Sequence, residues 1–231
     1  MPQRITVVDA FTDRAFAGNP AAVCVLARPA SDAWMKDVAR EMNLSETAFL
    51  NPTDEPGVFS LRWLTPTVEV DLCGHATLAA AHVLWEEGHL APDIVARFAT
   101  RSGTLTAGRR GAQIELDFPA IQTTETPAPE GFIAALGADV VFCGATRMDI
   151  LVELADEAAV RSLSPDFGLL ARLPVRGVIA TSLSARAHFD FASRFFAPAS
   201  GINEDPVTGS AHCALAVYWG EPLIGCIVDG P

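Results

Sequence analysis

The chain has 231 residues, of which 16 are Lys or Arg and 28 are Asp or Glu, so its formal net charge is −12. Half of the residues are hydrophobic and 19% are charged, which excludes a disordered chain and suffices for a sizeable core. The acidic balance argues against a nucleic-acid partner, because phosphate binding needs basic patches. No apolar run is long enough to span a membrane, and the amino terminus lacks the apolar stretch of a signal peptide.

The five cysteines are widely spaced and form no CxxC pair. The spacing therefore predicts neither a zinc site nor a disulfide framework. A reduced, cytoplasmic compartment is the simplest interpretation of this usage. The sequence also lacks a P-loop and a dinucleotide-binding fingerprint, and we expect no metal.

The first half of the chain alternates short strands with two helices. We predict strands at residues 5–8, 21–26, 47–50, 58–64, 95–100 and 113–118, and helices at 32–42 and 74–85. Ser31 or Asp32 is suited to cap the first helix. The second predicted helix is rich in Ala and apolar nearly all round, which is typical of a helix surrounded by protein.

The segment 119–131 is rich in Pro, Thr and Glu and has no periodicity, so we predict a linker there. It would join an N-terminal domain, residues 1–118, to a C-terminal domain, residues 132–231. In the second half we predict strands near 140–143, 150–154, 178–181 and 189–195, and an apolar helix near 209–219. Each half thus resembles β structure around one buried helix.

The two halves resemble each other in sequence. Arg62-Trp-Leu-Thr-Pro resembles Arg194-Phe-Phe-Ala-Pro, and Gly74-His-Ala-Thr-Leu-Ala resembles Gly209-Ser-Ala-His-Cys-Ala, at separations of 132 and 135 residues. Trp85 and Trp219 match at a similar separation. A repeat of this length indicates duplicated domains rather than a solenoid, whose repeats are far shorter.

In each half, a Gly therefore begins a predicted buried helix, at Gly74 and at Gly209. The start of a helix offers unpaired N–H groups and a positive partial charge, so two such starts facing a cleft would bind a small carboxylate. This would allow an acidic protein to bind an anion without basic side chains. The alternative is that both glycines serve only close packing of the helices.

Two titratable residues are candidates for proton transfer. Glu46 lies between a helix end and an apolar strand, where burial would raise the pKa of its carboxyl and suit acid–base work. The local sequence alone is more typical of an exposed Glu at a strand start. His75 lies at a predicted helix start, which disfavours its cationic form; its alternative role is to cap the helix.

The loop before the second apolar helix contains Asp205 and leads into Ser210. Either residue is also suited to an ordinary turn or helix cap. Cys73 precedes the first apolar helix, where a thiol can act as a nucleophile or as an acid–base group. The matching position in the second half is Thr208, so the chain has no symmetric thiol pair.

Four motifs occur together and in order: Gly18-Asn-Pro-Ala-Ala-Val, Leu44-Ser-Glu-Thr-Ala-Phe, Cys73-Gly-His-Ala-Thr and Glu204-Asp-Pro-Val-Thr-Gly-Ser-Ala-His. In this combination the chain resembles the PhzF-like family of phenazine-biosynthesis-related isomerases, from about residue 5 to residue 219. The resemblance implies the diaminopimelate-epimerase-like fold, an α+β class with two similar domains. Each domain would be a β barrel wrapped around a central helix, with the site between them.

The resemblance also implies a cofactor-independent isomerase that acts on a small carboxylate. Glu46 would transfer the proton, and His75 and Asp205 would position the substrate and assist proton movement. Substrate-binding positions would be Asn19, Gly74, Gly209 and Ser210. The expected reaction is a double-bond shift, in which Glu46 removes a proton and returns it elsewhere on the same face.

Two alternatives remain open from the sequence. One is a racemase or dehydratase of the same fold that uses Cys73 with Thr208, and the other is a non-catalytic binding protein for small molecules. Members of the family usually continue well beyond the second apolar helix, whereas this sequence ends at Pro231. A shortened second domain would leave apolar edges exposed, and we expect a homodimer to cover them.

Overall fold

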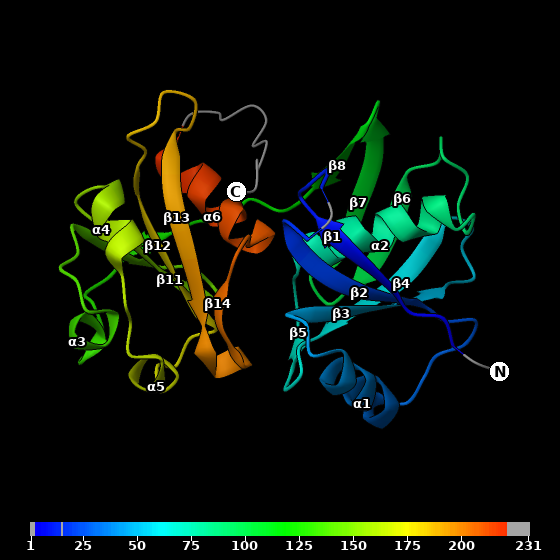
Figure 1. Ribbon diagram of the computed structural model, residues 1–231, viewed down its shortest axis with the longest axis horizontal. Helices are drawn as coiled ribbons and strands as arrows, with labels where there is room; N and C mark the ends of the chain where they lie inside the picture. Colours follow the sequence, from blue (N-terminus) through cyan, green and yellow to red (C-terminus); the bar gives the residue numbers. More distant parts are fainter. Residues whose placement is uncertain (1–2, 15, 221–231) are drawn as a thin grey trace. The chain divides into compact units, whose positions relative to one another are not determined.

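The computed structural model describes residues 3–14 and 16–220 (Figure 1). These residues form two compact units that divide after Pro119. The first unit contains β1 (Thr6–Ala10), β2 (Asn19–Val25), α1 (Asp32–Met42), β3 (Glu46–Pro52), β4 (Val58–Leu64), β5 (Glu69–Val70), α2 (Gly74–Glu86), β6 (Ala96–Thr100), β7 (Gly103–Arg110) and β8 (Gln113–Asp117). The predicted strands and both predicted helices of this half are therefore confirmed, and Ser31 caps α1 by accepting a hydrogen bond from the N–H of Trp34.

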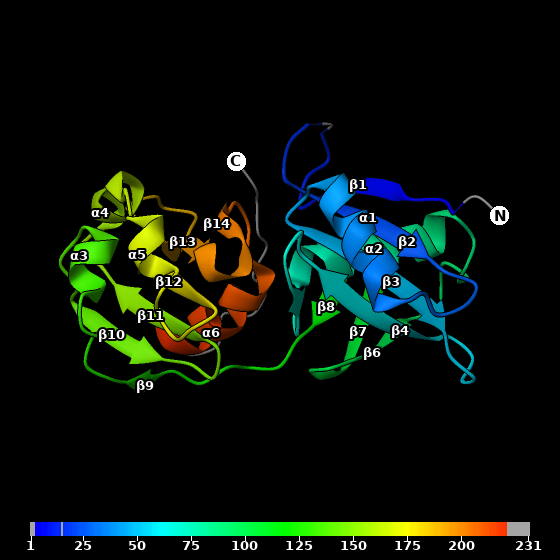
Figure 2. The same cartoon turned by 90° about the horizontal axis from the view of Figure 1, so that it is seen from below.

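The sheet of the first unit wraps around α2. Its strand order is β1-β2-β3-β4-β6-β7-β8, with β5 paired to β4. Helix α2 contacts β1, β2 and β3 and also β8 at the opposite end of this order, which requires the sheet to curl around the helix (Figures 1 and 2). The curling explains why ten of the 13 residues of α2 are buried, as its apolar sequence predicts.

The loop between β1 and β2 depends on Gly18, whose φ of +73° lies in the left-handed region. A Cβ atom at this position would lie 2.2 Å from the carbonyl oxygen of Ala10. Gly88 has the same φ of +73° but has no atom within 4 Å of the corresponding position. The two glycines therefore separate the effect of backbone strain from that of a steric clash.

We expect Gly18→Ala to destabilise the protein by about 3 kcal/mol, from left-handed strain and overpacking together. Gly88→Ala, which carries only the strain, should cost about 1 kcal/mol. Urea unfolding followed by circular dichroism measures both free energies. Equal losses in the two variants would show that the contact with Ala10 does not constrain this loop.

The second unit has its own six-stranded sheet. Its elements are β9 (Thr124–Glu125), α3 (Phe132–Leu136), β10 (Phe142–Ala145), β11 (Asp149–Glu153), α4 (Glu157–Ser162), α5 (Phe167–Leu170), β12 (Gly177–Leu183), β13 (Phe191–Ala197), the 3₁₀ turn Pro198–Ser200, β14 (Ile202–Asp205) and α6 (Gly209–Trp219). The strand order is β14-β13-β12-β11-β10-β9. The predicted helix at 209–219 is confirmed with the same bounds.

Alternating residues of this sheet face two different helical layers, because successive side chains of a strand point to opposite faces. Leu151, Ile179 and Phe195 pack with the buried residues of α6. On the other face, the short helices α3, α4 and α5 cover residues of the same strands, among them Val152 and Phe196. Figure 2 shows these helices around the second sheet. Helix α6 is thus the second unit's counterpart of α2.

The segment predicted as a linker, 119–131, has structure of its own. Strand β9 pairs with β10, Ile121 is buried, and its N–H donates to the carbonyl oxygen of Cys213 on α6. From residue 120 onward the segment belongs to the second unit. Residues 221–231, which include the end of the predicted second domain, lie outside the described residues.

The internal repeat corresponds to a repeated ion pair. Arg62 on β4 forms two hydrogen bonds, of 2.8 and 2.6 Å, with Glu69 on β5. Arg194 on β13 forms two, of 2.7 and 2.8 Å, with Glu204 on β14. In both units this bidentate pair joins the two strands that precede the buried helix.

Both units therefore show one curled β-sheet packed on an apolar helix, which is buried in the first unit and partly buried in the second. This arrangement confirms the predicted α+β, diaminopimelate-epimerase-like class. The longest helix in the described part of the chain, α2, has 13 residues. Within that part, no helix combines the length and the apolar character that crossing a bilayer requires.

Candidate active site

Glu46 is the first residue of β3, and the fold buries it. Strand β3 runs parallel to β2 with Glu46 beside Ala21, and only 8% of Glu46 is exposed. The prediction from local sequence that Glu46 is exposed is therefore wrong, because α2 covers this face of the sheet. Asn19, also buried, lies two residues before Ala21 on β2 and thus on the same face as Glu46.

His75 lies in the first turn of α2 and connects two other polar groups. Its Nε2 atom is 3.4 Å from Oε2 of Glu46, and its Nδ1 atom is 3.5 Å from Sγ of Cys73. The imidazole thus lies between a carboxylate and a thiol, and all three side chains are buried. In the first unit the fold brings together two predicted catalytic residues, Glu46 and His75, and adds the thiol of the alternative mechanism.

Burial lowers the pKa of His75 from its usual 6.5 to about 3. The imidazole is therefore neutral at pH 7, as its position at a helix start predicts. One ring nitrogen of a neutral imidazole donates a hydrogen bond and the other accepts one. A donor facing Glu46 and an acceptor facing the Cys73 thiol fit this environment, so the ring is able to pass a proton between the two groups.

The pKa of His75 predicts a specific dependence of stability on pH. The unfolded chain binds a proton on His75 below about pH 6.5, whereas the folded chain does so only near pH 3. The unfolded state is thus favoured as the pH falls through this window, and the loss between pH 7 and pH 5 should be about 2 kcal/mol from this residue.

His75→Asn removes the titrating group, so this share of the pH dependence should disappear. Urea unfolding of both proteins at pH 7 and pH 5 gives the comparison, with each protein serving as its own reference at pH 7. An equal loss of stability in both proteins would contradict the assignment.

The second unit brings together a different set of predicted residues at the start of α6. Thr208 donates a hydrogen bond of 2.6 Å to Oδ2 of Asp205, which is buried at the end of β14. The Thr208 side chain therefore does not cap α6, and Cys73 likewise makes no side-chain cap of α2. His212, whose pKa burial lowers, has Nδ1 2.8 Å from the carbonyl oxygen of Thr208.

Sequence reasoning missed the ion pair that supports this helix start. Arg176 bonds both carboxylate oxygens of Asp149, at 2.8 and 2.5 Å, and donates a further bond of 3.1 Å to Oγ of Ser210. The Asp149 side chain is 2% exposed and that of Arg176 is 16% exposed. The three residues are far apart in the sequence. The pairing of β11 with β12 brings Asp149 beside Arg176, and the packing of α6 on these strands adds Ser210.

Four of the predicted site residues lie at the starts of α2 and α6, and the other three, Asn19, Glu46 and Asp205, lie on strands. Gly74 is the first residue of α2 and Gly209 the first of α6, with Ser210 next to it. Glu46, His75 and Asn19 lie in the first unit, and Asp205 lies in the second. Each unit therefore supplies one helix start and at least one buried carboxyl.

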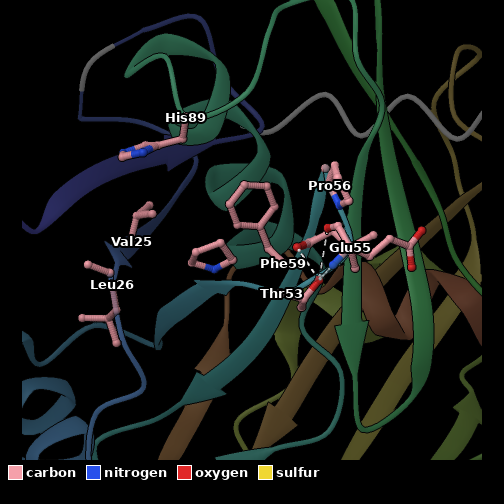
Figure 3. A pocket seen from close by; sticks show the side chains of 11 residues that line it. Val25, Leu26, Thr53, Glu55, Pro56, Phe59 and His89 are labelled. Carbon is pink, nitrogen blue, oxygen red and sulfur yellow. Dashed lines mark hydrogen bonds between the residues drawn. The ribbon is translucent and has the colours of Figure 1, made fainter.

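The first unit also contains a cavity of about 420 Å³ that none of these residues lines (Figure 3). Its walls come from the ends of β2 and β3, the start of β4 and the segment after α2, and include Val25, Leu26, Thr53, Phe59 and His89. The lining is mostly apolar. The groups suited to proton transfer at carbon are those around Glu46, outside this cavity.

A family model described as phenazine biosynthesis-like protein, PhzC-PhzF, matches residues 8–224 of the chain. The chain belongs to the phenazine biosynthesis-like family. An uncharacterized isomerase of Halalkalibacterium halodurans is 54% identical over 224 residues, which cover 96% of this chain and 84% of that protein. The human phenazine biosynthesis-like domain-containing protein is 40% identical, with 95% and 84% covered. Because the chain belongs to this family and several of its relatives are named isomerases, it is an enzyme of the isomerase class.

Solved structures agree with this family. The crystal structure of a PhzF-family protein from Enterococcus faecalis has a TM-score of 0.83 and 42% identity, covering 95% of this chain and 83% of that one. A hydroxyproline epimerase from Agrobacterium vitis, at 12% identity, has a TM-score of 0.65. This second likeness concerns the fold alone, and it relates phenazine biosynthesis-like proteins to epimerases in architecture.

Proposed function

We propose that the protein is a cofactor-independent isomerase that shifts a double bond in a small carboxylate metabolite by moving one proton. The observation that carries the proposal is the buried Glu46 carboxyl beside the neutral His75 at the start of α2. A buried carboxyl close to a neutral imidazole is suited to removing a proton from carbon and returning it.

In this proposal Glu46 is the base, and His75 holds the carboxyl and the substrate in place. The N–H groups at Gly74, which no side chain of the N-cap residue satisfies, bind a negatively charged oxygen of the substrate. Asn19 contributes a polar amide on the same face of the sheet as Glu46. The reaction is redox-neutral, because the proton taken from one carbon is delivered to another carbon of the same molecule.

The start of α6 in the second unit carries its own groups suited to a carboxylate. Gly209 and Ser210 offer N–H and hydroxyl donors, and Asp205 offers a polar group beside them. The Thr208 hydroxyl, which bonds Asp205 at 2.6 Å, holds this carboxyl in orientation. The binding of an anion thereby relies on helix starts, in agreement with the net charge of −12.

Isotope exchange tests the proposal without a known product. The protein is incubated in heavy water with a panel of small unsaturated and keto carboxylates, and deuterium incorporation is followed by proton NMR. We expect incorporation together with a shifted double bond for at least one compound of this class. Tight binding of a carboxylate with no exchange would instead identify a binding protein.

A second candidate, a racemase or dehydratase that uses Cys73, is favoured by one observation. The thiol lies 3.5 Å from Nδ1 of His75, which is within reach for proton exchange between them. Alkylation of Cys73 would abolish that activity, whereas the double-bond shift by Glu46 requires no thiol chemistry. We also propose a homodimer in a cytoplasmic compartment, where the described cysteines, none of which forms a disulfide, remain reduced.

A further inference from the structure

We propose that Glu46, Cys73 and His75 together bind one thiophilic divalent cation, with Zn²⁺ as the best fit, and that the bound ion blocks the reaction. A thiolate, an imidazole and a carboxylate are the three side-chain ligand types that zinc takes in proteins. The cysteine spacing in the sequence shows no zinc motif. The site appears only when β3 brings Glu46 beside the start of α2.

The thiol and the imidazole already have the separation that zinc requires. A tetrahedral ion with a Zn–S bond of about 2.3 Å and a Zn–N bond of about 2.0–2.1 Å places sulfur and nitrogen about 3.6 Å apart. The distance between Sγ of Cys73 and Nδ1 of His75 is 3.5 Å. An ion is therefore able to bind both atoms without any movement of the start of α2.

The Glu46 carboxylate is within reach as the third ligand. One ligand atom from each of the three residues lies within 4.8 Å of the other two. A tetrahedral ion with a Zn–S bond of about 2.3 Å and a Zn–O bond of about 2.0–2.2 Å holds sulfur and oxygen about 3.6 Å apart. A rotation of the Glu46 side chain that brings its oxygen closer by at most about 1.2 Å therefore completes the set. Three protein ligands leave a fourth position for water or for a carboxylate.

The position of Cys73 and His75 on the same helix start supports a built site rather than a chance cluster. Cys73 is the N-cap of α2 and His75 is in its first turn, so the helix itself fixes their separation. The ion takes Nδ1, so Nε2 of His75 keeps its proton and faces Oε2 of Glu46 at 3.4 Å. Burial also limits the competition of water with a bound ion, because the side chains of His75 and Glu46 are 2% and 10% exposed.

Inhibition follows from the same contacts and rests on the proposed function. An ion bonded to the carboxylate removes the lone pair that Glu46 needs as a base, and the thiol proton of Cys73 is released to the solvent on binding. Binding itself does not depend on the identity of the reaction. The two parts of the proposal are therefore separable by experiment.

The test uses the full chain, freed of metal with a chelator and titrated with Zn²⁺ against a chromophoric competitor. We expect one ion per chain, bound at least about 100-fold more weakly by Cys73→Ser and by Glu46→Gln. Substitution with Co²⁺ should give a thiolate-to-cobalt charge-transfer band that Cys73→Ser lacks. Thermal unfolding of each metal-free variant verifies that it is folded.

Cys213→Ser and Cys143→Ser are the matched controls, because they remove described free thiols that do not belong to this group. Both should retain the affinity and the cobalt band of the parent protein. Zinc binding that survives Cys73→Ser, or that disappears with either control, would overturn the site. If zinc binds as expected but isotope exchange continues in its presence, the inhibition is wrong while the metal site stands. Absence of exchange in the metal-free protein would count against the proposed function alone.

Discussion

Glu46→Gln should lower the rate of deuterium exchange about a thousandfold while the protein stays folded. The amide keeps the size and the buried position of the carboxyl but cannot accept a proton from carbon, and acid–base groups typically contribute 10²- to 10⁴-fold to a rate. Because the neutral His75 lies 3.4 Å from Oε2, the substitution removes no ion pair. The substrate KM should change far less than kcat.

Glu157→Gln is the matched control for this variant. Glu157 is also buried, at 7% exposure, and it accepts hydrogen bonds from Arg161 and from the N–H of Ala185. The same chemical change at this carboxylate should reduce stability and leave the exchange rate per folded molecule unchanged. Near-normal exchange in Glu46→Gln would show that another group is the base.

Asp149→Asn should destabilise the protein by about 3 kcal/mol, the effect of breaking a buried ion pair. The guanidinium of Arg176 would then remain largely buried, above the ring of Phe195, without its carboxylate partner. The hydrogen bond from Arg176 to Ser210 would also lose its support. We therefore expect a higher KM for a carboxylate substrate in addition to a lower unfolding midpoint.

The exposed pair of Arg97 and Glu55 is the control for this second variant. Its N–O distance is 2.9 Å, but the two side chains are 45% and 63% exposed, so Glu55→Gln should cost less than about 1 kcal/mol. Replacing both partners of the buried pair, by Asp149→Leu with Arg176→Met, should cost less than Asp149→Asn alone. Similar losses at the exposed and buried pairs would contradict this account.

The sequence predicts regular elements best where a strong local pattern exists. The bounds of β4 and α6 agree with the predicted ones, because an apolar strand pattern and an apolar Ala-rich run are unambiguous. No strand is predicted over the residues of β7, because Gly103, Gly108 and two arginines are typical of a turn. Pairing with β6 and β8 overrides these turn residues.

The three short helices of the second unit, α3, α4 and α5, are not predicted, for a different reason. Helix α4 has only six residues, too few for a visible period, although Asp156 caps it by accepting a hydrogen bond from the N–H of Ala159. A capping residue followed by Glu and two alanines is the local signal that indicates this helix.

The candidate site was only partly predictable for a physical reason. Local sequence identifies His75 and Cys73 as neighbours at a helix start, because they are two residues apart. The burial of Glu46 depends on the register of β3 and on the packing of α2 against it, which no local pattern encodes. The resemblance to a known family identified Glu46 as a site residue. The fold then explains why its carboxyl is protected from solvent.

The enclosure of α2 by both ends of its sheet has a consequence for how the chain folds. Helix residues 74–86 contact β1, at residues 6–10, and β8, at residues 113–117. The core of the first unit is thus complete only after nearly 120 residues have left the ribosome. Non-local contacts of this kind slow folding, so the apolar helix that carries His75 must stay protected from aggregation during synthesis until the last strand arrives.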